Sequence, residues 1–79
     1  MAVNPNSVIY AGYGCYRKTY DVTGIITTKL RNGQTTIHAS NDVFGDPAPG
    51  DKKYLYVVWK EGDLLKSGVT GEGDNLNLG

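Results

Sequence analysis

A short loop in the middle of the chain carries the side chains most suited to chemistry. Residues Phe44–Gly50 read Phe-Gly-Asp-Pro-Ala-Pro-Gly, and Lys53 and Tyr54 follow at the start of an apolar run. Two prolines fix the backbone around Asp46, so its carboxylate is displayed at low entropic cost. A carboxylate, an amine and an aromatic ring on a rigid edge suit polyol recognition, because hydroxyls bind charged groups and sugar rings stack on aromatic ones. An ordered loop with a surface ion pair is an equally good interpretation of these residue types.

Catalytic and metal chemistry is harder to assemble. His38 is the one histidine and Cys15 the one cysteine, so an internal disulfide is excluded and a four-ligand zinc site is not expected. No nucleophile is spaced to act with His38, and Cys15 has no second cysteine, so structural or incidental roles are favoured for both. Gly71–Asp74 lacks the lysine of a phosphate loop, and Asn41–Asp46 lacks the spacing and closing glutamate of an EF-hand. We predict no enzyme activity, no cofactor and no metal.

Charge and composition narrow the range of partners. Eight basic and eight acidic residues give zero net charge, which disfavours nucleic acid and membrane surfaces as partners. No run approaches the roughly 18–20 apolar residues of a membrane span, and Met1–Pro5 lacks the features of a signal peptide. One unpaired cysteine favours a reducing cytoplasm. A chain this short has a thin margin of stability, so good packing or self-association is expected.

Strand and helix patterns indicate the elements that position the loop. Apolar runs typical of strands occur at Val8–Ala11, Thr35–Ala39, Lys53–Lys60, Leu64–Thr70 and Leu76–Leu78. Apolar residues from Ile25 to Leu30 have a spacing compatible with about two helical turns, which Tyr20–Thr23 can cap and Asn32-Gly33 can end. A strand is the alternative there, because threonines and Gly24 weaken a helix. The prediction is a mainly β (α+β) fold, a small antiparallel five-stranded sandwich-like sheet with one short helix near residues 22–31.

Four local features are more specific. Lys53–Lys60 is apolar on both alternating faces, which predicts a central strand covered on both sides. Asn41–Gly50 holds two prolines, two glycines and two aspartates, which predicts a loop throughout. Gly12–Gly14 is expected to end the first strand, and Glu61–Asp63 to form a hairpin turn. All of these elements fit one domain spanning residues 1–79.

The order of several motifs resembles the galactose/rhamnose-binding lectin domain of the sea-urchin-egg-lectin type. That family has an Ala-x-Tyr-Gly-Arg segment, a Phe-Gly-Asp-Pro-Cys loop and a Lys-Tyr-Leu strand. The matching segments here are Ala11–Gly14, Asn32-Gly33, Ala39–Pro47 and Lys53–Leu55, so the resemblance spans roughly residues 8 to 59. Two positions depart from it, because Ala48 stands in place of the loop cysteine and Cys15 in place of the arginine.

The C-terminus carries a further element of this resemblance. The first strand of the lectins has a Glu-Gly-x-x-Leu-x-Leu pattern, which here occurs last, at Glu72–Leu78. We hypothesise a circularly permuted, cysteine-poor form of the fold, in which Leu76–Leu78 pairs beside Val8–Ala11. The resemblance then implies a single lectin-like domain whose sugar-binding residues are Tyr13, Asp46, Lys53 and Glu72.

The resemblance also implies a role for each of these residues and a form of assembly. Glu72 and Asp46 would accept hydroxyl protons from a galactose- or rhamnose-type sugar, Lys53 would donate, and Tyr13 would pack or orient. One shallow site binds weakly, so useful avidity needs several copies and we expect a homo-oligomer.

A second resemblance leads to a different class of function. The same order of motifs resembles the C-terminal domain of DnaJ-like cochaperones, which implies a protein–protein interaction or structural module. Exposed aromatic residues such as Tyr16, Tyr20 and Tyr56 would then contact a protein and not a sugar.

Overall fold

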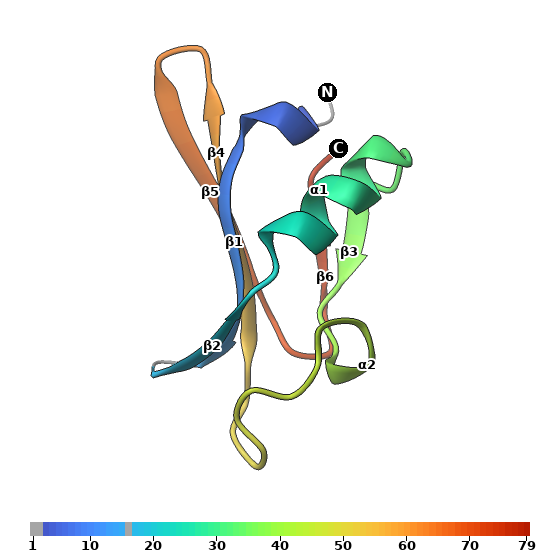
Figure 1. Ribbon diagram of the computed structural model, residues 1–79, viewed down its shortest axis with the longest axis vertical. Coiled ribbons are helices and arrows are strands. Elements are labelled where there is room, and N and C mark those ends of the chain that lie inside the picture. The colour runs from blue at the N-terminus through green and yellow to red at the C-terminus, as the bar shows by residue number, and fades with distance from the viewer. Residues whose placement is uncertain (1–2, 16) are drawn as a thin grey trace.

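The computed structural model describes residues 3–15 and 17–79, and within them the chain forms six strands in two sheets (Figure 1). The larger sheet is antiparallel and has the order β2-β1-β4-β5. Its strands in that order are Lys18–Asp21, Val8–Cys15, Tyr54–Glu61 and Leu64–Gly71. The mainly β prediction is confirmed, although the strands divide between two sheets and β2 was not foreseen, because Lys-Thr-Tyr-Asp lacks apolar alternation.

A second layer covers one face of this sheet. It contains a two-stranded antiparallel sheet of β3 (Thr36–His38) and β6 (Asn75–Asn77), the helix α1 (Thr23–Arg31) and the short helix α2 (Asn41–Phe44). A single 3-10 turn, η1 (Pro5–Ser7), precedes β1. In Figure 1, α1, β3, β6 and α2 all lie on the same side of the larger sheet. The molecule is therefore two layers thick, with one core between them.

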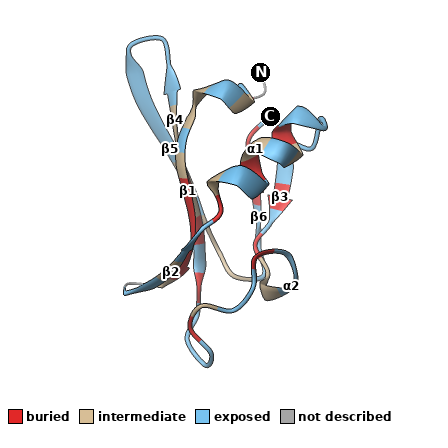
Figure 2. Cartoon of the chain, viewed as in Figure 1, coloured by how far each residue is buried: buried red, intermediate tan, exposed pale blue. Residues whose placement is uncertain are grey.

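The core residues come from both layers, and Figure 2 marks buried residues in red on each of them. The largest fully buried side chains are Tyr13, Ile26, Ile37, Leu55, Val22 and Val57. On the opposite face of β4, Tyr54 is 45% exposed, and Tyr56 and Val58 are only half-buried. The strand is central, as predicted, but the prediction that both of its faces are covered is wrong. One nine-residue helix and a pair of three-residue strands cover a single face.

The strand β1 continues through the two glycines that were expected to end it. A Cβ atom at Gly12 would lie 2.8 Å from Cζ of the Tyr56 ring, and one at Gly14 would run into the backbone of Lys18 and Thr19. These glycines therefore let the Tyr56 ring and the backbone of β2 come close to β1. Glycine in a strand often serves such a close approach and need not end the strand.

Local signals at both ends explain why α1 forms. The Asp21 carboxylate accepts hydrogen bonds from the backbone N–H of Thr23 at 3.0 Å and from its hydroxyl at 2.6 Å. These bonds lower the pKa of Asp21 below its ordinary value. At the other end, Gly33 N donates to the Leu30 carbonyl and Gln34 N to the Lys29 carbonyl, the Schellman pattern of a helix C-terminus. The predicted helix is confirmed over Thr23–Arg31.

Two glycine-to-alanine substitutions should have opposite effects on stability. At both Gly33 and Gly24 an added Cβ has no heavy atom within 4 Å, so backbone conformation alone decides the outcome. Gly33 has φ +83°, and we expect Gly33→Ala to cost roughly 1–2 kcal/mol. Gly24 is helical, and Gly24→Ala should stabilise by up to about 1 kcal/mol. Denaturant midpoints of the two variants measure both effects. If both substitutions changed stability in the same direction, the backbone conformations described for Gly24 and Gly33 would be contradicted.

The segment predicted to be a loop throughout contains the one-turn helix α2. The Ser40 hydroxyl accepts a hydrogen bond from Val43 N at 3.3 Å at its start, and Gly45, with φ +88°, ends it. The prediction of a loop is therefore wrong for Asn41–Phe44. A serine cap acts on only one turn here, and the prolines that follow prevent the helix from continuing.

The predicted pairing of the last strand is also wrong. Leu76 lies opposite Ile37 in β3, and among the described residues a backbone hydrogen bond from Val3 N to the Leu78 carbonyl at 2.7 Å joins this end of the chain to the N-terminal segment. The edge of β1 at Ala11 is already occupied, because Val22 N donates to the Ala11 carbonyl at 2.9 Å. Burial of Leu76 against Ile37 therefore fixes the position of β6 in the second layer.

Candidate functional site

Three of the four predicted residues form a charged cluster at the end of the sheet nearest α2. The Lys53 ammonium lies 2.9 Å from the Asp46 carboxylate and 3.5 Å from the Glu72 carboxylate, and it donates to the Ala48 carbonyl at 3.2 Å. Only 3% of the Lys53 side chain is exposed, against 37% for Asp46 and 31% for Glu72. One buried cation therefore holds two half-exposed carboxylates side by side.

Backbone hydrogen bonds fix Glu72 in this cluster. Glu72 N donates to the Lys53 carbonyl at 2.8 Å, and Lys53 N donates to Glu72 Oε1 at 3.1 Å. The turn after β5 is thus bonded to the residue that precedes β4. The predicted proximity of Glu72 to Asp46 and Lys53 is confirmed, although this turn brings it there and not the predicted pairing with β1.

Tyr13 reaches the same region from β1. It is fully buried, its ring lies 5.1 Å from that of Phe44, and its hydroxyl donates to Asn41 Oδ1 at 2.8 Å. Burial raises the pKa of Tyr13, the charge of Glu72 raises it further, and Lys53 acts in the opposite direction. Tyr13 therefore orients Asn41 from behind and has no exposed surface for a ligand.

A pocket of about 290 Å³ lies against this cluster. Its lining comes from the α2 turn on one side and the β5–β6 turn on the other, and four of its six residues have polar side chains: Ala39, Ser40, Asn41, Asp42, Glu72 and Gly73. Gly73 N donates to the Ala39 carbonyl at 2.8 Å, which joins the two sides. Glu72 belongs to both the cluster and the pocket, and Asn41, which is bonded to the buried Tyr13, lines the same pocket. These are the two side chains that buried residues hold in place beside a ligand.

The geometry changes the role predicted for Lys53. Its three ammonium protons face three acceptors, one on each of Asp46, Glu72 and Ala48. Since the side chain is buried as well, Lys53 positions the two carboxylates and does not itself donate to a ligand. Ser40, Asn41 and Asp42 were not among the predicted site residues. Their signal in the sequence was the serine followed by two short polar residues, which is typical of a helix start and not specific to a site.

Tyr54, which the sequence offered as an aromatic platform, points away from the pocket. It lies on the open face of the sheet, with the Lys52 ammonium 5.7 Å from its ring centroid. The pocket lining contains no aromatic side chain. A ligand in this pocket would therefore be held by hydrogen bonds and not by stacking.

Alkaline pH should destabilise the domain through this site. The hydrogen bond to Asp46 raises the pKa of Lys53 above its ordinary 10.5, and burial raises that of Tyr13 above 10.0. Both folded-state pKa values exceed the unfolded ones, so this stability is complete below about pH 10 and is lost as the pH rises through the folded values. We expect urea midpoints to fall above about pH 10, and less steeply in Tyr13→Phe. An equal fall in that variant would contradict the assignment to Tyr13.

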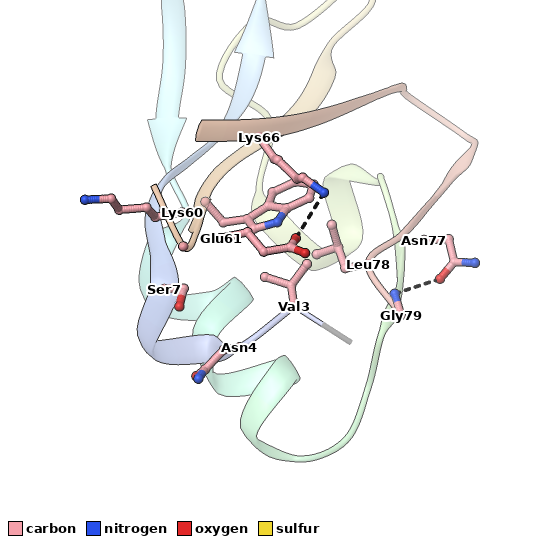
Figure 3. Close-up of a pocket in the computed structure, with 11 residues that line it drawn as sticks. Val3, Asn4, Ser7, Lys60, Glu61, Lys66, Asn77, Leu78 and Gly79 are labelled. Carbon is pink, nitrogen blue, oxygen red and sulfur yellow. Dashed lines mark hydrogen bonds and ion pairs between the residues drawn. The ribbon is translucent and has the colours of Figure 1, made fainter. Parts of the chain in front are cut away.

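A larger pocket of about 400 Å³ lies near the N-terminal segment and the β4–β5 hairpin (Figure 3). Val3, Trp59 and Leu78 contribute to its lining, and none of the four predicted residues does. Among the described residues, Trp59 Nε1 is buried without a hydrogen-bond partner. The ion pair in this pocket, Glu61 with Lys66 at 3.3 Å, is 59% and 45% exposed, so its charges are not fixed as those of the buried cluster are.

Comparisons with known proteins give no relative from which the role of this site could be inferred. No protein family, curated protein or solved structure matches the chain. Over residues 3–15 and 17–79, no helix is long and apolar enough to cross a membrane. Over the same residues, no three His, Cys, Asp or Glu side chains come together as a metal site.

Proposed function

We propose that this domain binds a carbohydrate of the galactose or rhamnose type and carries out no catalysis. The observation that carries the proposal is the buried Lys53, which bonds Asp46 and holds Glu72 in place in the wall of the pocket. A buried lysine bonded to two carboxylates fixes them before a ligand arrives, which lowers the entropic cost of binding.

The chemistry of the pocket fits a pair of neighbouring hydroxyl groups. Glu72 supplies a carboxylate that accepts hydrogen bonds, and charge-assisted bonds of this kind are about twice as strong as neutral ones. Asn41 supplies an amide whose oxygen already accepts from Tyr13, so its N–H₂ group remains for a ligand oxygen. The Glu72 carboxylate on one wall can accept from one hydroxyl of a diol, and the Asn41 amide on the other wall can donate to the neighbouring hydroxyl oxygen.

The proposed affinity is low. The pocket is small and lacks an aromatic ring for stacking, and few hydrogen bonds hold the sugar. Several copies acting together would give useful avidity, so we propose a homo-oligomer as the working form. The single unpaired Cys15 supports a cytoplasmic location for it.

The alternative is a protein–protein interaction module, favoured by the aromatic residues on the surface. Tyr20 is 47% exposed and Tyr54 45%, while Tyr56 is half-buried and Tyr16 lies outside the described residues. An interaction through this surface would leave the polar pocket unused. The two functions therefore predict different binding residues.

A screen of immobilised glycans separates these functions. The full chain should bind galactose- or rhamnose-terminated glycans, and Glu72→Gln should weaken the signal at least about tenfold, because a neutral amide accepts weaker hydrogen bonds than a carboxylate. Glu61→Gln is the matched control, since Glu61 is an exposed glutamate in a different ion pair. Absence of binding to every glycan, or equal binding by Glu72→Gln, would reject the sugar site.

A further inference from the structure

The two edges of the larger sheet differ in a way that points to a partner. Edge strands are usually protected from pairing by shortness and by charged side chains. The edge strand β2 has four residues, with Lys18 at one end and Asp21 at the other. The opposite edge strand β5 has eight residues and one charge, Lys66, whose ammonium lies 3.3 Å from the Glu61 carboxylate. Only β2 has the usual protection.

The unprotected strand also exposes large apolar side chains. Leu64, Leu65 and Val69 are 64%, 69% and 65% exposed, the highest values among the large apolar side chains of the described residues. Figure 2 shows much of β5 in the colour of exposed residues. Leu65 lies opposite Lys60 and Val69 opposite Tyr56 in β4. Since alternate residues share a face, Leu65 and Val69 both lie on the open face of the sheet, two residues on either side of Ser67.

We propose that β5 pairs with β5 of a second copy in antiparallel orientation, about a two-fold axis through Ser67. This register places Leu65 of each copy directly across from Val69 of the other, so the same apolar pair forms twice. Ser67 faces its own equivalent, and Lys66 faces Gly68. Directly opposite apolar residues are the pairs that stabilise antiparallel strands, and a two-fold interface uses the same surface on both copies.

Charge favours a second copy as the occupant. The chain has zero net charge, so two copies approach without long-range repulsion. Within the paired strands the one charged side chain, Lys66, is neutralised by Glu61 of its own copy and meets no like charge across the interface. An extended peptide from another protein could also bond the unpaired backbone groups of β5. The positions of Leu65 and Val69, however, are symmetric about Ser67, so a second copy of β5 matches them.

The pairing would also set the spacing of two sugar sites, a consequence that rests on the proposed function. Glu72 follows β5 directly, five residues from the axis, so the two copies carry it at opposite ends of the joined strands. At about 3.4 Å per residue over ten residues, the two glutamates would be roughly 34 Å apart along the strands. The dimer itself does not depend on sugar binding and can be tested without it.

Sedimentation velocity of the full chain over a concentration series tests the dimer. We expect a reversible monomer–dimer equilibrium whose dissociation constant rises at least about tenfold in Leu65→Lys and in Val69→Lys. Ile25→Lys is the matched control, since Ile25 is a 39% exposed isoleucine on α1, and it should leave the equilibrium unchanged. A monomer at every concentration overturns the proposal and leaves a peptide of another protein as the occupant. A dimer whose dissociation constant is unchanged by Leu65→Lys and by Val69→Lys also overturns it.

A cysteine cross-link tests the register separately. In a Cys15→Ser background, Ser67→Cys places two thiols across the axis, where opposite Cα atoms are within the distance that a disulfide spans. Oxidation should give a covalent dimer in high yield. Lys18→Cys on the opposite edge, in the same background, should stay monomeric. A dimer in solution that does not cross-link through Ser67→Cys would show that β5 is not paired in this register.

Discussion

Replacing Lys53 with methionine should weaken sugar binding and lower the melting temperature of the domain. The substitution keeps most of the buried apolar stem but removes the ammonium that bonds Asp46, Glu72 and the Ala48 carbonyl. Two carboxylates would then face each other without a cation between them, and a buried acceptor would lose its partner. We expect the affinity for a glycan to fall by about tenfold or more, which titration of the folded variant would measure.

The neighbouring lysine provides the control. Lys52 is exposed and its ammonium lies over the Tyr54 ring on the open face. Lys52→Met removes the same charge one residue away and should change neither the melting temperature nor the affinity appreciably. If both substitutions had the same small effect, the cluster around Lys53 would be a surface ion pair without a positioning role.

Replacing Leu55 with alanine should have the largest effect on stability. Leu55 is fully buried and lies opposite Tyr13 in the strand pair at the centre of the sheet. Truncating a leucine in such a position costs about 2–5 kcal/mol. A chain of 79 residues is stabilised by only about 4–12 kcal/mol in total. We therefore expect a melting temperature at least about 10 °C lower, which calorimetry or circular dichroism would measure.

An exposed apolar residue of the same sheet gives the comparison. Ile9 in β1 is 54% exposed, and Ile9→Ala should change the free energy of unfolding by no more than about 0.5 kcal/mol. A similar loss in both variants would mean that the core does not lie between the two layers as described.

Helix α1 shows which features the sequence could predict. Its start and end depend on bonds between residues close in the chain, Asp21 with Thr23 and Gly33 with Leu30. Such signals are visible in the residue types alone. Five of the six strands were located for a similar reason, since alternation such as that of Leu55 and Val57 is local.

The partners of the strands were not predictable in the same way. Alternation of Leu76 and Leu78 shows that one face of β6 is apolar, but it does not show which strand lies beside it. Similarly, both faces of β4 are apolar in sequence, and only the extent of the second layer decides that Leu55 is covered and Tyr54 is not. The partner of β6 and the covered face of β4 both depend on contacts between residues far apart in the sequence, and local patterns do not show these contacts.

The candidate site combines both cases. Tyr13, Asp46, Lys53 and Glu72 were placed together on a resemblance, and the structure joins the last three in one cluster while Tyr13 lies buried behind Asn41. The sequence did not show that Lys53 positions the carboxylates and does not donate to a ligand itself. Only its burial shows that it lies behind them. Asn41 was missed as a site residue because its contact with Tyr13 joins residues far apart in the chain.

Titration of the ¹⁵N-labelled chain with the best glycan from the screen tests the central claim most directly. The proposed site predicts saturable shifts concentrated at residues 39–42 and 72–73, and affinity at least about tenfold weaker in Glu72→Gln. Asn41→Ala should weaken binding as well, while Glu61→Gln should match the unaltered chain. Shifts confined to the pocket near Trp59, or shifts at the cluster that ignore both Glu72→Gln and Asn41→Ala, would contradict a sugar site built on Lys53.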